Sequence, residues 1–68
     1  MKDDAKKLGE NLKKIRMTKN ITQTELAETL GVDKSFISNI ENGKANPTLS
    51  TIAGLAKVLK VSTNELLK

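Results

Sequence analysis

Apolar residues recur at helical spacing in five separate segments of the chain. In the first, Leu8, Leu12 and Ile15 stand at i, i+4 and i+7, which places them on one face of a helix. The other helices are expected at residues 23–30, 34–42, 49–59 and 63–67. No segment shows the apolar and polar alternation that is typical of a half-buried strand. The pattern therefore predicts a compact all-α fold of five helices.

Residues with capping or helix-ending properties separate these segments. Thr22 and Glu25 have the spacing of a capping box, which opens the second helix. Gly31 follows that helix, where a left-handed residue is cheapest as glycine. Asp33 can cap the third helix, which Gly43 ends. We expect Thr22 and Asp33 to accept capping hydrogen bonds through their side chains.

The fourth helix follows Thr48 and contains a glycine. Its apolar positions keep helical spacing and mark its apolar face: Leu49, Ile52, Ala53, Ala56 and Leu59. Gly54, in the middle of this helix, costs up to about 1 kcal/mol relative to Ala. We interpret it as an exposed or close-packed position.

The second and third helices are too short and too close together to stand alone. Leu26 on the first of them, and Ile37 with Ile40 on the second, mark apolar faces that must pack together. Gly31 lies between the two helices. Two short helices joined at a steep angle by a tight turn with glycine form a helix-turn-helix. The motif is expected at about residues 23–42.

Length and composition bound the classes of function. Sixty-eight residues are enough for one domain, which we expect to span residues 1–68. Cysteine and histidine are both absent, so disulfides, thiolate nucleophiles, imidazole bases and the usual zinc ligands are excluded. We therefore expect no enzyme activity, no cofactor, no metal and no small-molecule ligand.

The longest apolar runs are only a few residues long. They are too short for a membrane-spanning helix or for a signal peptide. We expect no membrane partner and a cytoplasmic protein of bacterial or phage origin.

Basic residues outnumber acidic residues by twelve to eight, which gives a net charge of +4. Residues 1–20 hold seven of the basic and three of the acidic residues, so the excess is concentrated around the first helix. Such a balance favours a polyanionic partner, but it is equally compatible with a solvated surface.

The third helix has a polar side opposite its buried side. Ile37 and Ile40 define the buried side. Away from it lie short or polar side chains that are nearly uncharged: Lys34, Ser35, Ser38, Asn39 and Asn42. Base edges in the major groove of DNA offer mixed donors and acceptors, which such a surface suits.

As a twenty-residue unit, this stretch resembles the helix-turn-helix of the Cro/C1-type family, which includes phage repressors and xenobiotic-response-element proteins. The matching residues are Gln23, Ala27, Gly31, Ile37 and Ile40, at the first, fifth, ninth, fifteenth and eighteenth positions. Glu41-Asn42-Gly43-Lys44 is also typical of the family, and the likeness extends from about Leu8 to Leu67. It implies a five-helix lambda-repressor-like domain with the motif at helices 2 and 3.

The resemblance also implies roles for residues near the motif. The positions that match base-reading residues of the family are Lys34, Ser35 and Asn39, with Ser38 and Asp33 as further contributors. For Asp33, capping is the favoured role. The residues that match phosphate-contacting positions, or lie near the phosphates, are Gln23, Thr22, Asn42 and Lys44.

Arg16, the only arginine, matches a family position that pairs with the acid at Glu41. A planar guanidinium suits such a bidentate pair better than lysine does. A phosphate contact is the alternative for Arg16, and both roles are compatible. Phe36, the only aromatic residue, is favoured as a core residue over a contact with a thymine methyl group.

The function expected from these observations is sequence-specific DNA binding by a transcriptional regulator. We expect a repressor that binds the major groove of a palindromic operator as a homodimer. Leu66 and Leu67 could form a dimer contact or close the core. The alternative function is that of an antitoxin or a transcriptional bridging protein whose main partner is another protein.

Overall fold

Five helices account for most of residues 2–68, the part of the chain that the computed structural model describes. They are α1 (Lys2–Thr18), α2 (Gln23–Leu30), α3 (Lys34–Glu41), α4 (Leu49–Leu59) and α5 (Thr63–Leu67). The expected all-α fold of five helices is confirmed. Side chains are described from Asp4 onward. None of the helices within residues 2–68 is long and apolar enough to cross a membrane.

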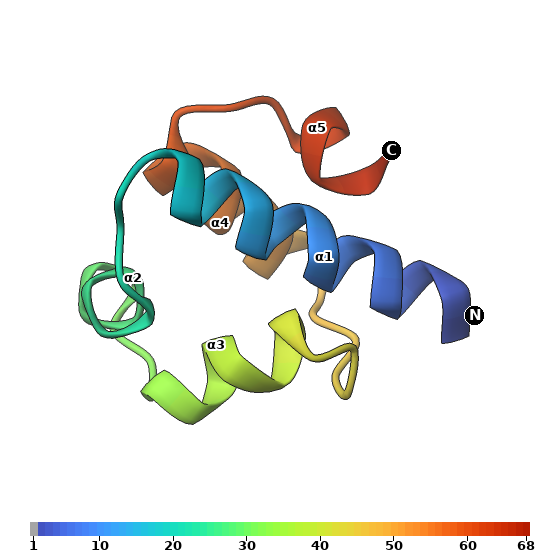
Figure 1. The fold of residues 1–68 in the computed structure, drawn as a ribbon, viewed down its shortest axis with the longest axis horizontal. Helices are drawn as coiled ribbons and strands as arrows, with labels where there is room; N and C mark the ends of the chain where they lie inside the picture. Colours follow the sequence, from blue (N-terminus) through green and yellow to red (C-terminus); the bar gives the residue numbers. More distant parts are fainter. Residues whose placement is uncertain (1) are drawn as a thin grey trace.

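α1 is the longest helix and lies at the centre of the arrangement (Figure 1). It packs against α3 on one side and against α5 on the other, while α4 lies behind it in this view. α2 is seen almost end-on and α3 lengthwise, so these two helices meet at a steep angle. α3 therefore lies at the edge of the molecule, where it packs against both α1 and α2 and leaves its other side free.

One core receives side chains from every helix. Its members with almost no exposed surface are Leu12, Leu26, Ile37, Ile40, Leu55, Leu59 and Leu66. Burial of each such side chain contributes about 1.5–3 kcal/mol. Because α2 and α3 each place only a few residues in this core, neither helix is expected to be stable apart from it.

The buried face of α4 differs from the expected one. Leu55 has no exposed surface and belongs to the core, whereas Leu49 is 71% exposed and Ala53 is also exposed. α4 packs against both α2 and α5, and this centres its buried stripe on Ile52, Leu55, Ala56 and Leu59. Leu49 is the first residue of the helix and lies beyond the end of that stripe. Leu49 and Ala53 thus keep helical spacing but lie outside the buried stripe.

The ends of α2 agree with the sequence prediction. The Glu25 backbone N–H donates to the Thr22 hydroxyl at 3.0 Å, and the Thr22 N–H donates to the Glu25 carboxylate at 2.8 Å. Gly31 ends the helix with φ of 73°, and no atom lies within 4 Å of the place where its Cβ would be. Glycine is therefore required at this turn by the backbone conformation and not by space.

Asp33 occupies the N-cap position of α3 without the expected capping hydrogen bond from its side chain. The Phe36 N–H, which a capping side chain would bind, donates instead to the backbone carbonyl of Asp33 at 3.0 Å. The prediction of a capping carboxylate was therefore wrong in this respect, and the exposed side chain of Asp33 has no capping role.

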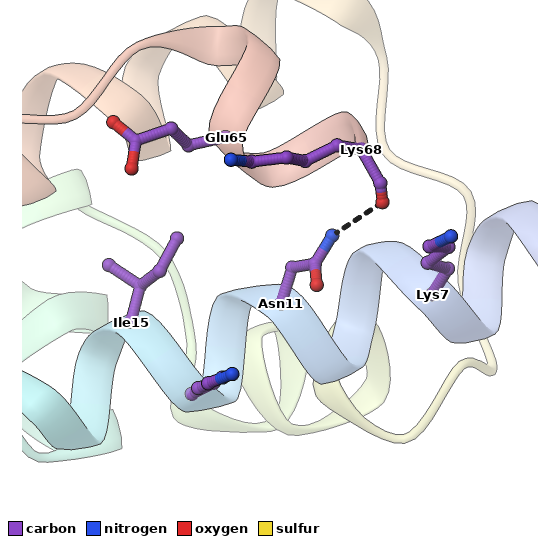
Figure 2. Close-up of a pocket in the computed structure, with 6 residues that line it drawn as sticks. Lys7, Asn11, Ile15, Glu65 and Lys68 are labelled. Carbon is purple, nitrogen blue, oxygen red and sulfur yellow. Dashed lines mark hydrogen bonds between the residues drawn. The ribbon is translucent and has the colours of Figure 1, made fainter.

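α5 is attached to α1 through Asn11. The Asn11 side-chain amide donates to the carbonyl oxygen of Leu66 at 2.9 Å. It also donates to that of Lys68 at 3.3 Å, the bond that Figure 2 shows. These bonds satisfy two carbonyls at the end of α5, where a helix has no internal donors. Leu66 is fully buried and closes the core, while Leu67 is 50% exposed. Leu66 is therefore the member of this pair that closes the core, and a dimer contact stays a prediction for Leu67.

Candidate nucleic-acid interface

The free side of α3 carries the polar residues that the sequence singled out. Lys34, Ser35, Asn39 and Asn42 are exposed, and Ser38 is half-buried. Ile37 and Ile40, on the opposite side, have no exposed surface. α3 therefore presents hydrogen-bonding groups outward along most of its length while it is held from behind by its aliphatic residues.

Gly9 lets α1 approach the end of α3 very closely. A Cβ atom on Gly9 would lie 2.3 Å from the carbonyl oxygen of Ile40 and 2.7 Å from that of Glu41. Real Cβ atoms do not come this close to backbone atoms, so only glycine fits here. The sequence does not indicate this role for Gly9, because a glycine inside a helix does not show which backbone it faces.

Arg16 and Glu41 form the ion pair that the family resemblance implied, and it joins α1 to the last residue of α3. Arg16 Nε donates to Glu41 Oε2 at 2.6 Å, and Arg16 Nη2 donates to Glu41 Oε1 at 3.1 Å. A third donor, Nη1, binds the backbone carbonyl of Ile21 at 2.7 Å. Arg16 is 9% exposed and Glu41 7%. Little of Arg16 remains accessible to a phosphate.

Gln23 joins this pair, which the sequence did not indicate. Its Nε2 donates to Glu41 Oε1 at 2.9 Å, and its side chain is half-buried at the start of α2. Glu41 thus receives hydrogen bonds from α1 and from α2 while it belongs to α3. Eighteen positions separate Gln23 from Glu41, so neither helical spacing nor a capping pattern could reveal the bond.

A shallow hollow of about 430 Å³ brings together three of the predicted contact residues and Arg16, for which a phosphate contact is the alternative role. Thr22 and Gln23, at the start of α2, line it together with Lys34, the first residue of α3. The rest of its lining is formed by Arg16, Met17, Asn20, Ile21 and Thr24. Backbone N–H groups at the first turn of a helix attract anions, and Lys34 adds a positive charge.

The other predicted phosphate contacts follow α3 directly. Asn42 and Lys44 are exposed on either side of Gly43, which has φ of 73°. The Asn42 amide lies 3.4 Å from the Ser38 hydroxyl, and the Lys44 N–H donates to the Asn39 carbonyl at 2.9 Å. These bonds tie the loop to the last turn of α3, so both residues have fixed positions relative to its exposed side.

Two further residues near the motif have structural explanations. Phe36 is half-buried and packs against the core, which agrees with the favoured role.

Hydrogen bonds from Thr22 lower the pKa of the Glu25 carboxyl group below its usual range. The bond from the Thr22 backbone N–H has the larger effect, and the Thr22 hydroxyl has the smaller one. Glu25 thus remains ionised within the capping box at neutral pH.

A second hollow, of about 520 Å³, lies between α1 and α5, away from α3 (Figure 2). Its lining contains none of the predicted contact residues, and consists of Lys7, Asn11, Lys14, Ile15, Glu65 and Lys68. Within the described residues, no three acidic, histidine or cysteine side chains are grouped to hold a metal ion. The candidate site for DNA binding is therefore the exposed surface of the helix-turn-helix motif.

Comparison with known proteins identifies the class. A family model described as "Helix-turn-helix" matches residues 12–66. The chain is 38% identical over 63 residues to the ImmF control region 10 kDa protein of Bacillus phage phi105, covering 93% of this chain and 70% of that protein. This protein thus belongs to the Cro/C1-type helix-turn-helix family of DNA-binding domains, a family of regulators and not of enzymes.

Two solved structures of restriction-modification controller proteins have the same fold. The structure of C.AhdI from Aeromonas hydrophila has a TM-score of 0.89 and 34% identity, covering 94% of this chain and 97% of that one. The tetramer of C.Esp1396I in complex with its natural 35 base-pair operator has a TM-score of 0.78 and 33% identity, covering 94% and 95%. The lambda-repressor-like fold expected from the sequence is confirmed by these similarities.

Proposed function

We propose that this protein is a sequence-specific transcriptional regulator that binds a palindromic operator as a dimer. The observation that carries the proposal is the exposed side of α3. Ser35, Asn39 and Lys34 face outward there, opposite the fully buried Ile37 and Ile40. An α-helix with its side chains is about 10–12 Å in diameter, which fits the width of the major groove, about 12 Å.

In the proposed complex, α3 supplies the base contacts and its neighbours hold the DNA backbone. Asn39 would pair with adenine, and Lys34 would donate to guanine O6 and N7, with Ser35 and Ser38 as further contacts. Thr22 and Gln23 would hold one phosphate segment from the start of α2. Asn42 and Lys44 would hold the other segment from beyond the end of α3. The role that we assign to Arg16 is the ion pair with Glu41, because the pair already uses three of its donors.

A dimer is proposed because operators of this kind are read at two half-sites about one DNA turn apart, roughly 34 Å. The domain measures 28 by 23 by 21 Å, so two copies in contact can reach successive major grooves. C.Esp1396I, which resembles this chain, assembles on its operator as a tetramer. Leu49 and Leu67 supply exposed apolar surface on α4 and α5, two helices that pack against each other.

Repression is the mode of action that we propose. A protein that covers an operator excludes other proteins from it without any further contact, whereas activation requires a dedicated surface for the polymerase. We place this action in the cytoplasm of a bacterium or of a phage host, where the DNA is. The exposed apolar residues do not favour the alternative of an antitoxin or bridging protein, which would need one large apolar surface for its partner. The exposed large apolar residues within positions 4–68 are Met17, Leu49 and Leu67, and they come from three different helices.

Selection of bound sequences from a random pool of duplex DNA tests the proposal. We expect a palindromic consensus with half-sites about 10 base pairs apart. Affinity should fall steeply with salt, because each phosphate contact releases counterions. A Leu67→Lys variant should bind a single half-site as before and the full operator more weakly. Recovery of no consensus, with an affinity that salt leaves unchanged, would contradict the proposal.

A further inference from the structure

Glu41 is an acceptor for two other helices, and its chemistry constrains both partners. An ionised carboxylate has no hydrogen to donate, so it can accept hydrogen bonds only. Its Oε2 is occupied by Arg16 Nε at 2.6 Å. Its Oε1 is shared by Arg16 Nη2 at 3.1 Å and Gln23 Nε2 at 2.9 Å. At 7% exposure, Glu41 depends on these donors in place of water.

The bond to Glu41 fixes the orientation of the Gln23 side chain. A glutamine amide has a donating nitrogen and an accepting oxygen, and the two are exchanged by a rotation of the terminal group. Only the nitrogen can face a carboxylate, so Nε2 of Gln23 is held on the side of Glu41. One hydrogen of Nε2 is used in this bond, and the second remains to be donated at the hollow beside Thr22 and Lys34.

We propose that Glu41 is a positioning residue for DNA binding, which holds Gln23 so that its remaining N–H is directed at a phosphate. Arg16 holds Glu41 in turn, and its own third donor is anchored on the Ile21 carbonyl next to the start of α2. The inference rests on the proposed function, and specifically on a phosphate contact by Gln23. It adds that the contact is prepared in the free protein, so that little side-chain freedom is lost on binding.

The Glu41→Gln variant tests this role with almost no change in volume. A glutamine at position 41 can donate as well as accept, so it no longer forces Nε2 of Gln23 to one side. We expect E41Q to bind every duplex, whether operator or unrelated sequence, about tenfold more weakly, because a hydrogen bond to a charged phosphate is lost or misdirected. A core variant, Leu59→Val, serves as the matched control for lowered stability and should bind DNA normally while it is folded.

Affinity measured for four proteins separates the inference from the proposed function. They are the natural protein, Q23A, E41Q and the double variant, each confirmed as folded by circular dichroism. We expect Q23A to weaken binding about tenfold in the natural background and to have almost no further effect in E41Q. If Q23A weakens binding equally in both backgrounds, the positioning role is wrong and the phosphate contact stands. If Q23A has no effect in the natural background, both the contact and the positioning role are wrong.

E41Q leaves Arg16 without a charged partner and could prevent folding. A second variant, in which the Q23A substitution can also be tested, covers this case. Replacement of the whole pair by apolar residues, R16M with E41L, removes both charges and is often neutral for stability. In this background Q23A should again have almost no effect on affinity. A tenfold effect there would overturn the inference.

Discussion

Gly9 of α1 lies against the carbonyl oxygen of Ile40, the residue before the end of α3, so closely that no side chain fits between the two helices. We expect Gly9→Ala to lower the free energy of unfolding by about 3 kcal/mol, the upper part of the range for overpacking, because the obstructing atoms are backbone. Urea denaturation measures this change. A cost below about 1 kcal/mol would mean that α1 can move away from α3 freely.

Gly54→Ala is the matched control on α4, and we expect the opposite sign. A Cβ atom at Gly54 would lie 3.6 Å from Leu30 Cδ2, an ordinary van der Waals contact. Because Ala is favoured over Gly inside a helix, the variant should gain up to about 1 kcal/mol. The same denaturation experiment serves both variants, and a loss of stability in Gly54→Ala would contradict the described packing around α4.

For the ion pair between Arg16 and Glu41, we expect single substitutions to cost more than the pair replaced together. Arg16→Ala and Glu41→Ala should each destabilise the protein by about 3–5 kcal/mol, because each leaves a buried charge without its partner. The double variant should cost clearly less than the two single costs combined. A double-mutant cycle by thermal unfolding measures the coupling, and strictly additive costs would be evidence against a shared pair.

Local patterns predicted local structure well. The helix-turn-helix follows from Gly31 and the two apolar faces, and the capping box from the spacing of Thr22 and Glu25, since each depends on near neighbours. The ion pair of Arg16 with Glu41 came from the family resemblance and not from any spacing. All these features were found because they follow from short-range chemistry or from a known pattern.

Apart from the capping bond expected of Asp33, what the sequence did not predict depends on how the helices pack. Leu49 keeps the spacing of a core residue, yet it lies beyond the end of the core, and Leu55 takes the central place because α4 has neighbours on two sides. The close approach at Gly9 and the bond from Gln23 to Glu41 join residues of different helices. No periodicity within one helix contains that information.

The capping box of α2 should make stability depend on pH in the acid range. Because hydrogen bonds from Thr22 lower the pKa of Glu25 in the folded protein, folding favours its ionised form. This contribution is fully present above the pKa of the unfolded chain, and it is lost as the pH falls through the lower pKa of the folded protein. Chemical denaturation from neutral to acidic pH should therefore show a smaller loss of stability in Glu25→Gln. An identical loss in both proteins would contradict this assignment.

Asn39→Ala should change the specificity of DNA binding and leave the fold intact. Its side chain is exposed, so truncation opens no cavity in the core. A base contact there carries roughly 1–3 kcal/mol of discrimination, which should be lost at one base pair of each half-site. Binding to a panel of operator variants measures this change. Gln23→Ala is the comparison, because loss of a phosphate contact should weaken all sequences alike. Equal losses on every variant for Asn39→Ala would assign it to the backbone instead.

α3 performs two tasks with different residues, which lie on opposite sides of the helix. Ile37 and Ile40 hold the helix in the core, whereas Ser35 and Asn39 contribute nothing to that packing. Substitutions at the outer positions can therefore accumulate one at a time without passing through an unfolded intermediate. Such a scaffold can diverge toward new DNA targets by single steps, and a library randomised at these outer positions should consist mostly of folded proteins with altered target preference.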